Sequence, residues 1–199
     1  MSFMSGIMLA GGILFIVGVV VVVLYLITTG KRDLPFDVTD DLGTCLVLKT
    51  KDVDTAYNSY LDLKKKQNGQ GMIISRIYPE RLLKKYSIND STLLWLSYEK
   101  TDSSIDPSSL DKLEYLVYDF VSVNKRSIVL LDGMEYLILQ NTFEETLKFL
   151  QSLSDHIILN GAILIIPLDP ASLDEKQLSL IERELETFQV NHRLMRFFE

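Results

Sequence analysis

The sequence predicts an α/β domain, a doubly wound and mainly parallel sheet with helices on both faces, preceded by one N-terminal transmembrane helix. Two patterns predict it. Residues 1–30 contain no Asp, Glu, Lys or Arg, so all 27 acidic and 20 basic residues of the 199 follow them. After this segment, apolar runs of strand length alternate with amphipathic stretches of helix length. We therefore divide the chain into a membrane helix (1–30), a polar tether (31–43) and an α/β domain (44–199).

The transmembrane helix is predicted over Ile7–Ile27, where the Tyr25 hydroxyl is the only polar side-chain group. As a helix this run would span roughly 30 Å, the thickness of the hydrocarbon core of a bilayer. A buried core helix is one alternative, but a small domain could not cover apolar side chains on every side of it. A cleaved secretory signal is another, but such a signal has basic residues before the apolar run, and MSFMSG has none.

The nearest basic side chains, Lys31 and Arg32, directly follow the apolar run. The positive-inside rule then places the α/β domain in the cytoplasm and the short N-terminus outside, so that the protein is a single-pass protein of the cell membrane. Gly6 and Ala10 have the small-xxx-small spacing that can pack membrane helices together. A homo-oligomer is therefore left open.

Strands are predicted where four to six mostly apolar residues occur without alternation, the pattern of strands buried on both faces of a parallel sheet. The five predicted strands are Thr44–Leu48, Met72–Ser75, Thr92–Leu96, Ile128–Leu131 and Ala162–Pro167. The tail Asn191–Phe198 is a candidate for a further edge strand.

Helices are predicted between the strands from capping residues and apolar stripes. Their predicted starts are near Asp52, at Pro79, after Asp106–Pro107, at Thr142 with Glu145, and at Ser172 with Glu175. The stripes are Val53, Ala56, Tyr57, Tyr60 and Leu61; Leu110, Leu113, Val117, Phe120 and Val121; Phe143, Leu147 and Leu150; and Leu178, Ile181, Leu185 and Phe188. A helix between successive strands implies crossover connections and a parallel sheet.

Ligands of open α/β sheets bind at the carboxyl ends of the strands, so the strand-to-helix turns are the places where a site is expected. A phosphate-binding loop after the first strand would be rich in glycine and end in Gly-Lys-Ser/Thr. The chain has no glycine between Gly43 and Gly69. The sequence therefore predicts that no nucleotide cofactor is bound through such a loop.

The fourth predicted strand ends in Asp132, which is the form of a Walker B strand whose aspartate helps to hold Mg²⁺, with Glu135 as a candidate water-activating carboxylate. The alternative is that Asp132 caps the helix begun by Met134, with Glu135 at the third helical position. Arg76, after the second strand, could bind an anion at the same edge or form an ion pair with Glu80 or Asp132. Both pairs of alternatives stay open.

Other chemistry is not indicated. His156 and His192 have no Cys or carboxylate at ligand spacing, so no metal site is predicted. Cys45 is expected to be an inert core thiol. The net charge of −7 argues against nucleic acid as a partner, because protein surfaces that bind nucleic acid are basic.

Several segments resemble the archaeal family known as domain of unknown function 835. They include DTAY at 54–57, ISRIYPERL at 74–82, LLDGMEYLI at 130–138, IPLDPASLDE at 166–175 and IERELE at 181–186. The resemblance covers roughly residues 44–188, and members of this family are often joined to membrane segments or signalling modules. The order of elements also resembles a RecA/KaiC-like ATPase core that lacks the phosphate loop. This likeness implies the spatial strand order five-one-four-three-two along the five predicted strands, with Asp132 beside the turn after Leu48.

The expected function is a single-pass membrane protein with a non-catalytic cytoplasmic interaction domain, in signalling or membrane-complex assembly, with an unidentified protein partner. The alternative is an atypical enzyme that handles a nucleotide or phosphoester with Asp132, Glu135 and Arg76 at the sheet edge. No metal or other cofactor is expected for the first function.

Overall fold

The computed structural model of the chain describes residues 43–188. Within them, no helix has both the length and the apolarity needed to cross a membrane. The predicted membrane helix Ile7–Ile27, nearly all of the tether, His192 and the candidate edge strand Asn191–Phe198 lie outside the described residues.

The described elements mostly alternate between strand and helix, as predicted, but a short additional strand follows the third strand directly and two helices follow one another before the sixth strand. In chain order they are β1 (Thr44–Lys49), α2 (Val53–Gln67), β2 (Gly71–Ser75), α3 (Pro79–Lys85), β3 (Ser91–Leu96), β4 (Ser104–Ile105), α4 (Leu110–Val123), β5 (Ile128–Asp132), α5 (Met134–Gln140), α6 (Phe143–Leu159), β6 (Ile163–Leu168), the 3₁₀ helix η1 (Pro170–Ser172), α7 (Glu175–Glu184) and β7 (Glu186–Phe188).

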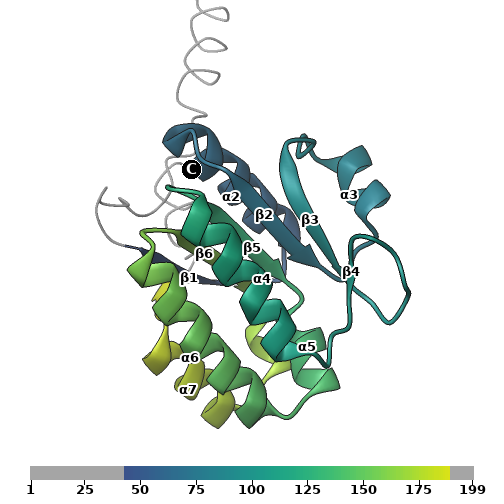
Figure 1. Cartoon of the computed structure of the whole chain (residues 1–199). Coiled ribbons are helices and arrows are strands. Elements are labelled where there is room, and N and C mark those ends of the chain that lie inside the picture. Colours follow the sequence, from purple (N-terminus) through teal and green to yellow (C-terminus); the bar gives the residue numbers. More distant parts are fainter. Residues whose placement is uncertain (1–42, 189–199) are drawn as a thin grey trace, which may run out of the picture. The chain divides into compact units, whose positions relative to one another are not determined.

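The strands form one seven-stranded sheet in the order β4-β3-β2-β5-β6-β1-β7, and each neighbouring pair is parallel (Figure 1). The predicted parallel sheet is therefore confirmed, with each of the five predicted strands found within one residue of its bounds. β5 lies at the centre of the sheet, and its residues Ile128–Leu131 are fully buried. This confirms the central position predicted for that strand.

The strand order predicted for the five core strands is wrong. The five predicted strands are β1, β2, β3, β5 and β6, and the predicted order places β5 beside β1. In the structure β6 lies between β5 and β1, so Asp132 does not lie beside the turn after Leu48. The order five-one-four-three-two does hold when β1, β2, β5, β6 and β7 are numbered one to five. β3 is an additional strand outside β2 and is mostly half-buried, and β7 is the fifth core strand. An apolar run alone did not distinguish an edge strand from a central one.

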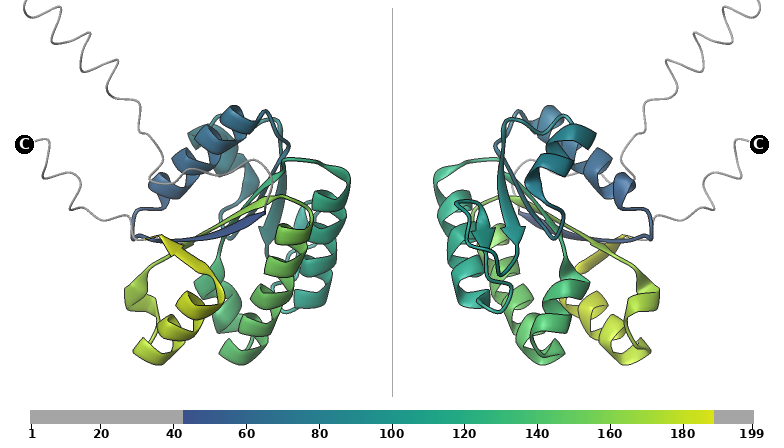
Figure 2. Two further views of the ribbon diagram at one scale, coloured as in Figure 1. Left: turned by 90° about the vertical axis from the view of Figure 1, so that its left-hand side faces the viewer. Right: turned by 90° about the vertical axis from the view of Figure 1, so that its right-hand side faces the viewer.

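Helices cover both faces of the sheet (Figure 2). α2 and α3 lie on one face, where Ala56, Tyr57, Tyr60 and Leu63 of α2 are buried. α4, α5, α6 and α7 lie on the other, and their apolar stripes form one core with Val129 and Leu131 of β5. Because successive strand residues point to opposite faces, Ile128 and Leu130 are available to the α2 side.

Three predicted helix starts are confirmed. Asp52 is the N-cap of α2, where its carboxylate accepts a hydrogen bond from the Asp54 N–H. Pro79 is the first residue of α3. Thr142 and Glu145 form a capping box at the start of α6.

Two predicted starts are wrong. The Asp106 carboxylate accepts hydrogen bonds from the N–H (2.8 Å) and hydroxyl (2.6 Å) of Ser108, so it closes a turn and α4 begins only after Ser109. The α7 capping box uses Asp174 with Gln177 instead of Ser172 with Glu175. α7 also ends at Glu184, so the last residue of its predicted stripe, Phe188, belongs to β7. The chain offers several capping residues in succession, and the packing of each helix decides which one is used.

Candidate functional site

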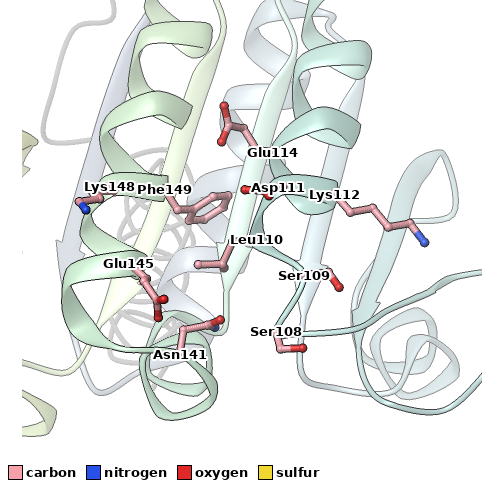
Figure 3. Close-up of a pocket in the computed structure, with 10 residues that line it drawn as sticks. All are labelled: Ser108, Ser109, Leu110, Asp111, Lys112, Glu114, Asn141, Glu145, Lys148 and Phe149. Atoms are coloured by element: carbon pink, nitrogen blue, oxygen red, sulfur yellow. The ribbon is translucent and has the colours of Figure 1, made fainter.

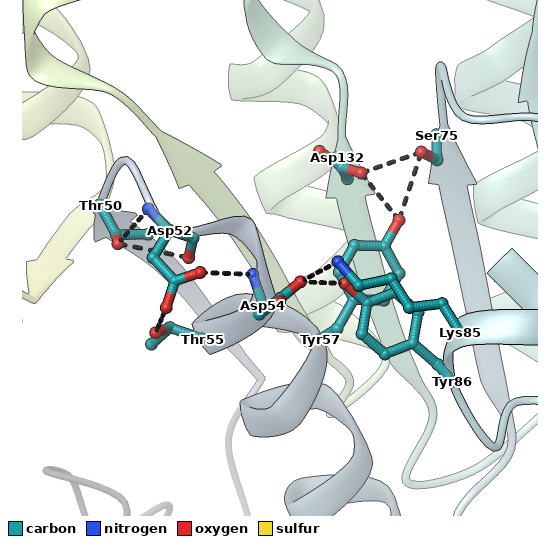
Figure 4. A network of polar contacts seen from close by, with 9 residues as sticks. All are labelled: Thr50, Asp52, Asp54, Thr55, Tyr57, Ser75, Lys85, Tyr86 and Asp132. Atoms are coloured by element: carbon teal, nitrogen blue, oxygen red, sulfur yellow. Dashed lines mark hydrogen bonds and ion pairs between the residues drawn. The ribbon is translucent and has the colours of Figure 1, made fainter. Parts of the chain in front are cut away.

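The carboxyl end of β5 presents Asp132 beside the last residue of β2, Ser75, with which it is in register. Asp132 Oδ2 accepts a hydrogen bond from the Tyr57 hydroxyl (2.7 Å) and one from the Ser75 hydroxyl (2.9 Å) (Figure 4). Ser75 Oγ in turn accepts from the Ile77 N–H (3.0 Å). Two hydroxyl donors from α2 and β2 therefore converge on one oxygen of Asp132.

The Tyr57 hydroxyl is held in its protonated, donating form. Burial raises the pKa of the Tyr57 phenol, and the neighbouring Asp132 carboxylate raises it further. The helix α5 begins after Gly133 without a side-chain cap, so the prediction that Asp132 caps this helix is wrong. Its carboxylate instead joins β5 to β2 and to the helix that covers them.

The other two predicted site residues have separate partners. Glu135 Oε1 accepts a hydrogen bond from the Asp169 N–H (3.0 Å), which ties α5 to the turn after β6. The Arg76 guanidinium lies over the Tyr136 ring, 4.1 Å from its centroid. One alternative had predicted an ion pair of Arg76 with Glu80 or Asp132, and neither pair occurs among the described contacts. Asp132, Glu135 and Arg76 thus lie at one edge of the sheet but are engaged in three different contacts.

The turn after β1 occupies the position of a phosphate loop and is organised by its own side chains (Figure 4). The Thr50 N–H donates to the Leu168 carbonyl (3.0 Å), and the Asp52 N–H donates to the Thr50 hydroxyl (3.0 Å). The Asp52 carboxylate accepts from the Asp54 N–H (3.1 Å) and the Thr55 hydroxyl (2.8 Å). A helix N-terminus attracts anions, and here the carboxylate of Asp52 is the anion.

Asp54 adds a second carboxylate in the first turn of α2. It accepts hydrogen bonds from Lys85 Nζ (2.5 Å) and from the Tyr86 hydroxyl. These two donors, Lys85 first, hold the pKa of Asp54 below its ordinary value. The Tyr86 ring stacks on Tyr57 with centroids 4.2 Å apart and planes at 3°. The stacked rings link the Asp54 contacts to those of Asp132.

A separate pocket of about 680 Å³ lies between the first turns of α4 and α6 (Figure 3). The charged side chains lining it are Asp111, Lys112, Glu114, Glu145 and Lys148. None of the site residues predicted from sequence lines this pocket. Three acids and two bases thus line the pocket, and Glu145 is already held by the capping box of α6.

His156 contacts a neighbouring helix, and Cys45 lies in the core. His156 Nε2 lies 3.1 Å from Glu114 Oε1, a contact that joins α6 to α4. Cys45 is buried in β1. Within residues 43–188, no group of three or more His, Cys, Asp or Glu side chains is placed to hold a metal ion.

Two residues of the Asp132 network, Tyr57 and Ser75, were not predicted as site residues. Tyr57 was assigned to an apolar helix stripe, and nothing in its local pattern shows where its hydroxyl points. Ser75 carried a usable signal, because it ends the strand before Arg76 and parallel strands bring their carboxyl ends to one edge.

Comparisons with known proteins agree with this fold. A family model described as a protein of unknown function, DUF835, matches residues 50–185. None of the curated proteins matches the sequence. A solved structure described as the structural study of Project ID PH0250 from Pyrococcus horikoshii OT3 has a TM-score of 0.52 at 17% identity, covering 78% of this chain and 85% of that one. The flagellar accessory protein FlaH from Methanocaldococcus jannaschii has a TM-score of 0.50 at 14% identity, covering 79% and 78%. At these identities the likeness shows a RecA-like α/β fold and nothing further.

Proposed function

Because this chain belongs to the DUF835 family of proteins of unknown function, we propose its function from its own residues: a non-catalytic cytoplasmic interaction domain carried by a membrane helix at Ile7–Ile27. Such a domain would serve in signalling or in the assembly of a membrane complex, with a protein as its partner.

The proposal rests on one observation: side chains of the protein itself occupy the position where a nucleotide would bind. Asp52 caps the helix whose N-terminus would face phosphates, and Asp132 is held by Tyr57 and Ser75. The Oδ2 atom of Asp132 already accepts from two hydroxyl donors, with which a Mg²⁺ ion at that oxygen would compete. These contacts favour a non-catalytic scaffold domain over a domain that hydrolyses a nucleotide.

Electrostatics supports the same conclusion. Charges of the same sign repel one another. A triphosphate at the start of α2 would approach the Asp52 carboxylate, and the nearby cation Lys85 is already paired with Asp54. Binding there would require these contacts to be broken.

A surface suited to a protein partner lies along α4. Tyr115 and Tyr118 are one turn apart and 63% and 44% exposed. They line a groove with Asp111, Glu114 and His156. Exposed tyrosines beside charged side chains are typical of protein interfaces.

Calorimetric titration of the full chain in detergent with MgATP and MgGTP tests the proposal. We expect no heat of binding for either nucleotide. Micromolar affinity for one of them, lost in the Asp132→Asn variant and kept in the Asp106→Asn control, would overturn the proposal in favour of the nucleotide-handling alternative.

Crosslinking in native membranes followed by pull-down of the full chain tests the partner. We expect a protein that is captured by the parent chain and lost when Tyr115 and Tyr118 are both replaced by Ser. Leu139→Ser provides a control, because Leu139 is 76% exposed but lies on α5. Capture that the double substitution leaves unchanged would exclude this groove as the interface.

A further inference from the structure

At the amino ends of the strands, which we call one edge of the sheet, four neighbouring chain segments lie side by side. Backbone hydrogen bonds of 2.9 Å join them in pairs: Ile128 N–H to the Gln70 carbonyl, Ile163 N–H to the Ser127 carbonyl, and Thr44 N–H to the Ala162 carbonyl. The loops before β2, β5 and β6 and the start of β1 therefore form one continuous surface, opposite the edge that holds Asp132.

Basic side chains gather on this surface, and we call Lys65, Lys66, Lys125 and Arg126 the basic edge. All four are exposed, two in the last turn of α2 and two in the loop before β5. The loop between α2 and β2 contacts the loop before β5, since a Cβ added at Gly69 would lie 1.9 Å from the Arg126 carbonyl oxygen. Four neighbouring cations are notable in a chain whose net charge is −7.

Two of the acidic groups near the same edge are paired with basic side chains. Asp90 Oδ1 lies 2.6 Å from Lys64 Nζ, and Glu184 Oε1 lies 3.2 Å from Arg183. Asp62, Asp119 and Asp155 are exposed about one turn back from the ends of α2, α4 and α6. Lys65 and Lys66 follow Asp62 along the chain, and Lys125 and Arg126 follow Asp119, so these cations lie closer to the starts of the strands.

Exposed apolar side chains stand beside these cations. Val123 ends α4 and is 72% exposed, and Leu159 ends α6 and is 82% exposed. α4 and α6 pack side by side and end at the same edge (Figure 1). Aliphatic tips among basic side chains are the composition of surfaces that rest on anionic membranes.

The polypeptide enters the domain at this edge. Gly43 packs against the backbone at the end of α6, where an added Cβ would lie 2.2 Å from the Ile157 carbonyl oxygen. Ile27, the last residue of the predicted membrane helix, is 16 residues earlier in the sequence. An extended chain of this length reaches about 55 Å at most. A membrane helix would therefore keep the basic edge within that distance of a bilayer.

We propose that the basic edge binds to an anionic lipid surface. Lys65, Lys125 and Arg126 pair with anionic headgroups, and Val123 and Leu159 insert between them. This inference rests on the membrane helix of the proposed function. Each basic side chain near an anionic membrane strengthens the contact about fivefold, so removal of two should weaken it about 25-fold.

The test uses the full chain reconstituted in vesicles that contain a nitroxide-labelled lipid as a quencher. A fluorophore is attached at Leu159→Cys or, as a control on the opposite edge, at Lys51→Cys, whose native side chain is 75% exposed. The native Cys45 is buried, and its labelling is measured on the parent chain. We expect quenching at position 159 in vesicles rich in phosphatidylserine, weak quenching in phosphatidylcholine alone, and weak quenching at position 51 in both.

Charge-reversal variants test whether quenching depends on the basic side chains or only on the domain being held near the bilayer. Lys125→Glu with Arg126→Glu should weaken the contact with the lipid surface at least 25-fold, and Lys65→Glu in the last turn of α2 should also weaken it. Lys112→Glu with Lys148→Glu makes the same change in net charge near the starts of α4 and α6 and should leave quenching unchanged.

The outcomes separate the two proposals. A chain that resists carbonate extraction from the vesicles but shows no quenching at position 159 overturns the binding of the basic edge to lipid and leaves the membrane helix standing. A chain that does not float with either kind of vesicle overturns both. Quenching that is equal in the two lipids or unaffected by charge reversal overturns the assignment to anionic lipid.

Discussion

Replacing Tyr57 by Phe should lower the free energy of unfolding by about 2 kcal/mol, the value of a hydrogen bond to a charged group. The Tyr57 ring is fully buried, and its hydroxyl donates to Asp132 over 2.7 Å. Phenylalanine keeps the ring and its stacking on Tyr86, so the substitution removes the hydroxyl and little else. The Ser75 hydroxyl would remain as a donor to Asp132, which limits the loss.

Thermal unfolding of the full chain, followed by near-ultraviolet circular dichroism, measures this effect. In a domain of this size each kcal/mol shifts the Tm by about 2–4 °C, so the Tm should fall by about 4–8 °C. Tyr115→Phe is the matched control, because this tyrosine is 63% exposed. Its effect should stay within about 0.5 kcal/mol.

A double-mutant cycle completes the test. Asp132→Asn removes the charge of the acceptor and Tyr57→Phe removes the donor of one hydrogen bond, so their combined effect should be smaller than the sum of the single effects. A Tm that Tyr57→Phe leaves unchanged, or strictly additive effects in the cycle, would refute the reasoning that this contact joins α2 to β5.

The pH dependence and the core give two further predictions. Burial raises the pKa of Tyr57 and of Tyr60 above the unfolded-state value of 10.0, so above that pH the unfolded chain loses protons that the folded chain keeps. Stability is therefore complete below about pH 10 and falls above it by about 1.4 kcal/mol per pH unit for each tyrosine; denaturant titrations should show this slope reduced in Tyr57→Phe, and a slope that this variant shares with the parent would contradict the assignment. Leu130→Asp should prevent folding, because it places an unpaired charge in the fully buried centre of β5, whereas Leu139→Asp on the exposed side of α5 should be tolerated; a cooperative melt of Leu130→Asp would refute the central placement.

The sequence predicted the elements well because their signals are local. Apolar runs marked five strands, and Pro79 and the Thr142–Glu145 capping box marked helix starts that the structure confirms. The parallel sheet followed from the helix between each pair of strands. The membrane helix at Ile7–Ile27, the cytoplasmic location and the absence of catalysis stay predictions.

The neighbours of each strand could not be read from the sequence. The runs that form β3 and β5 look alike, but β5 is fully buried at the centre and β3 is mostly half-buried. β7 is only three residues long and was absorbed into the predicted stripe of the helix before it. The first error arises because burial on the second face of a strand depends on which helices cross it, which a single apolar run does not show. The second arises because three residues are too few to show a strand pattern.

The sequence by itself determined that this chain is an α/β protein of the DUF835 family without a phosphate-loop motif, and that Asp132 ends a core strand. Only the tertiary structure decided what Asp132 does. Tyr57 precedes it by 75 residues, and their hydroxyl and carboxylate meet because α2 crosses back over β6 and β5. Helix periodicity fixed which side of α2 is buried, but the path of the crossover, set by the packing of the whole sheet, fixed which carboxylate lies beneath it.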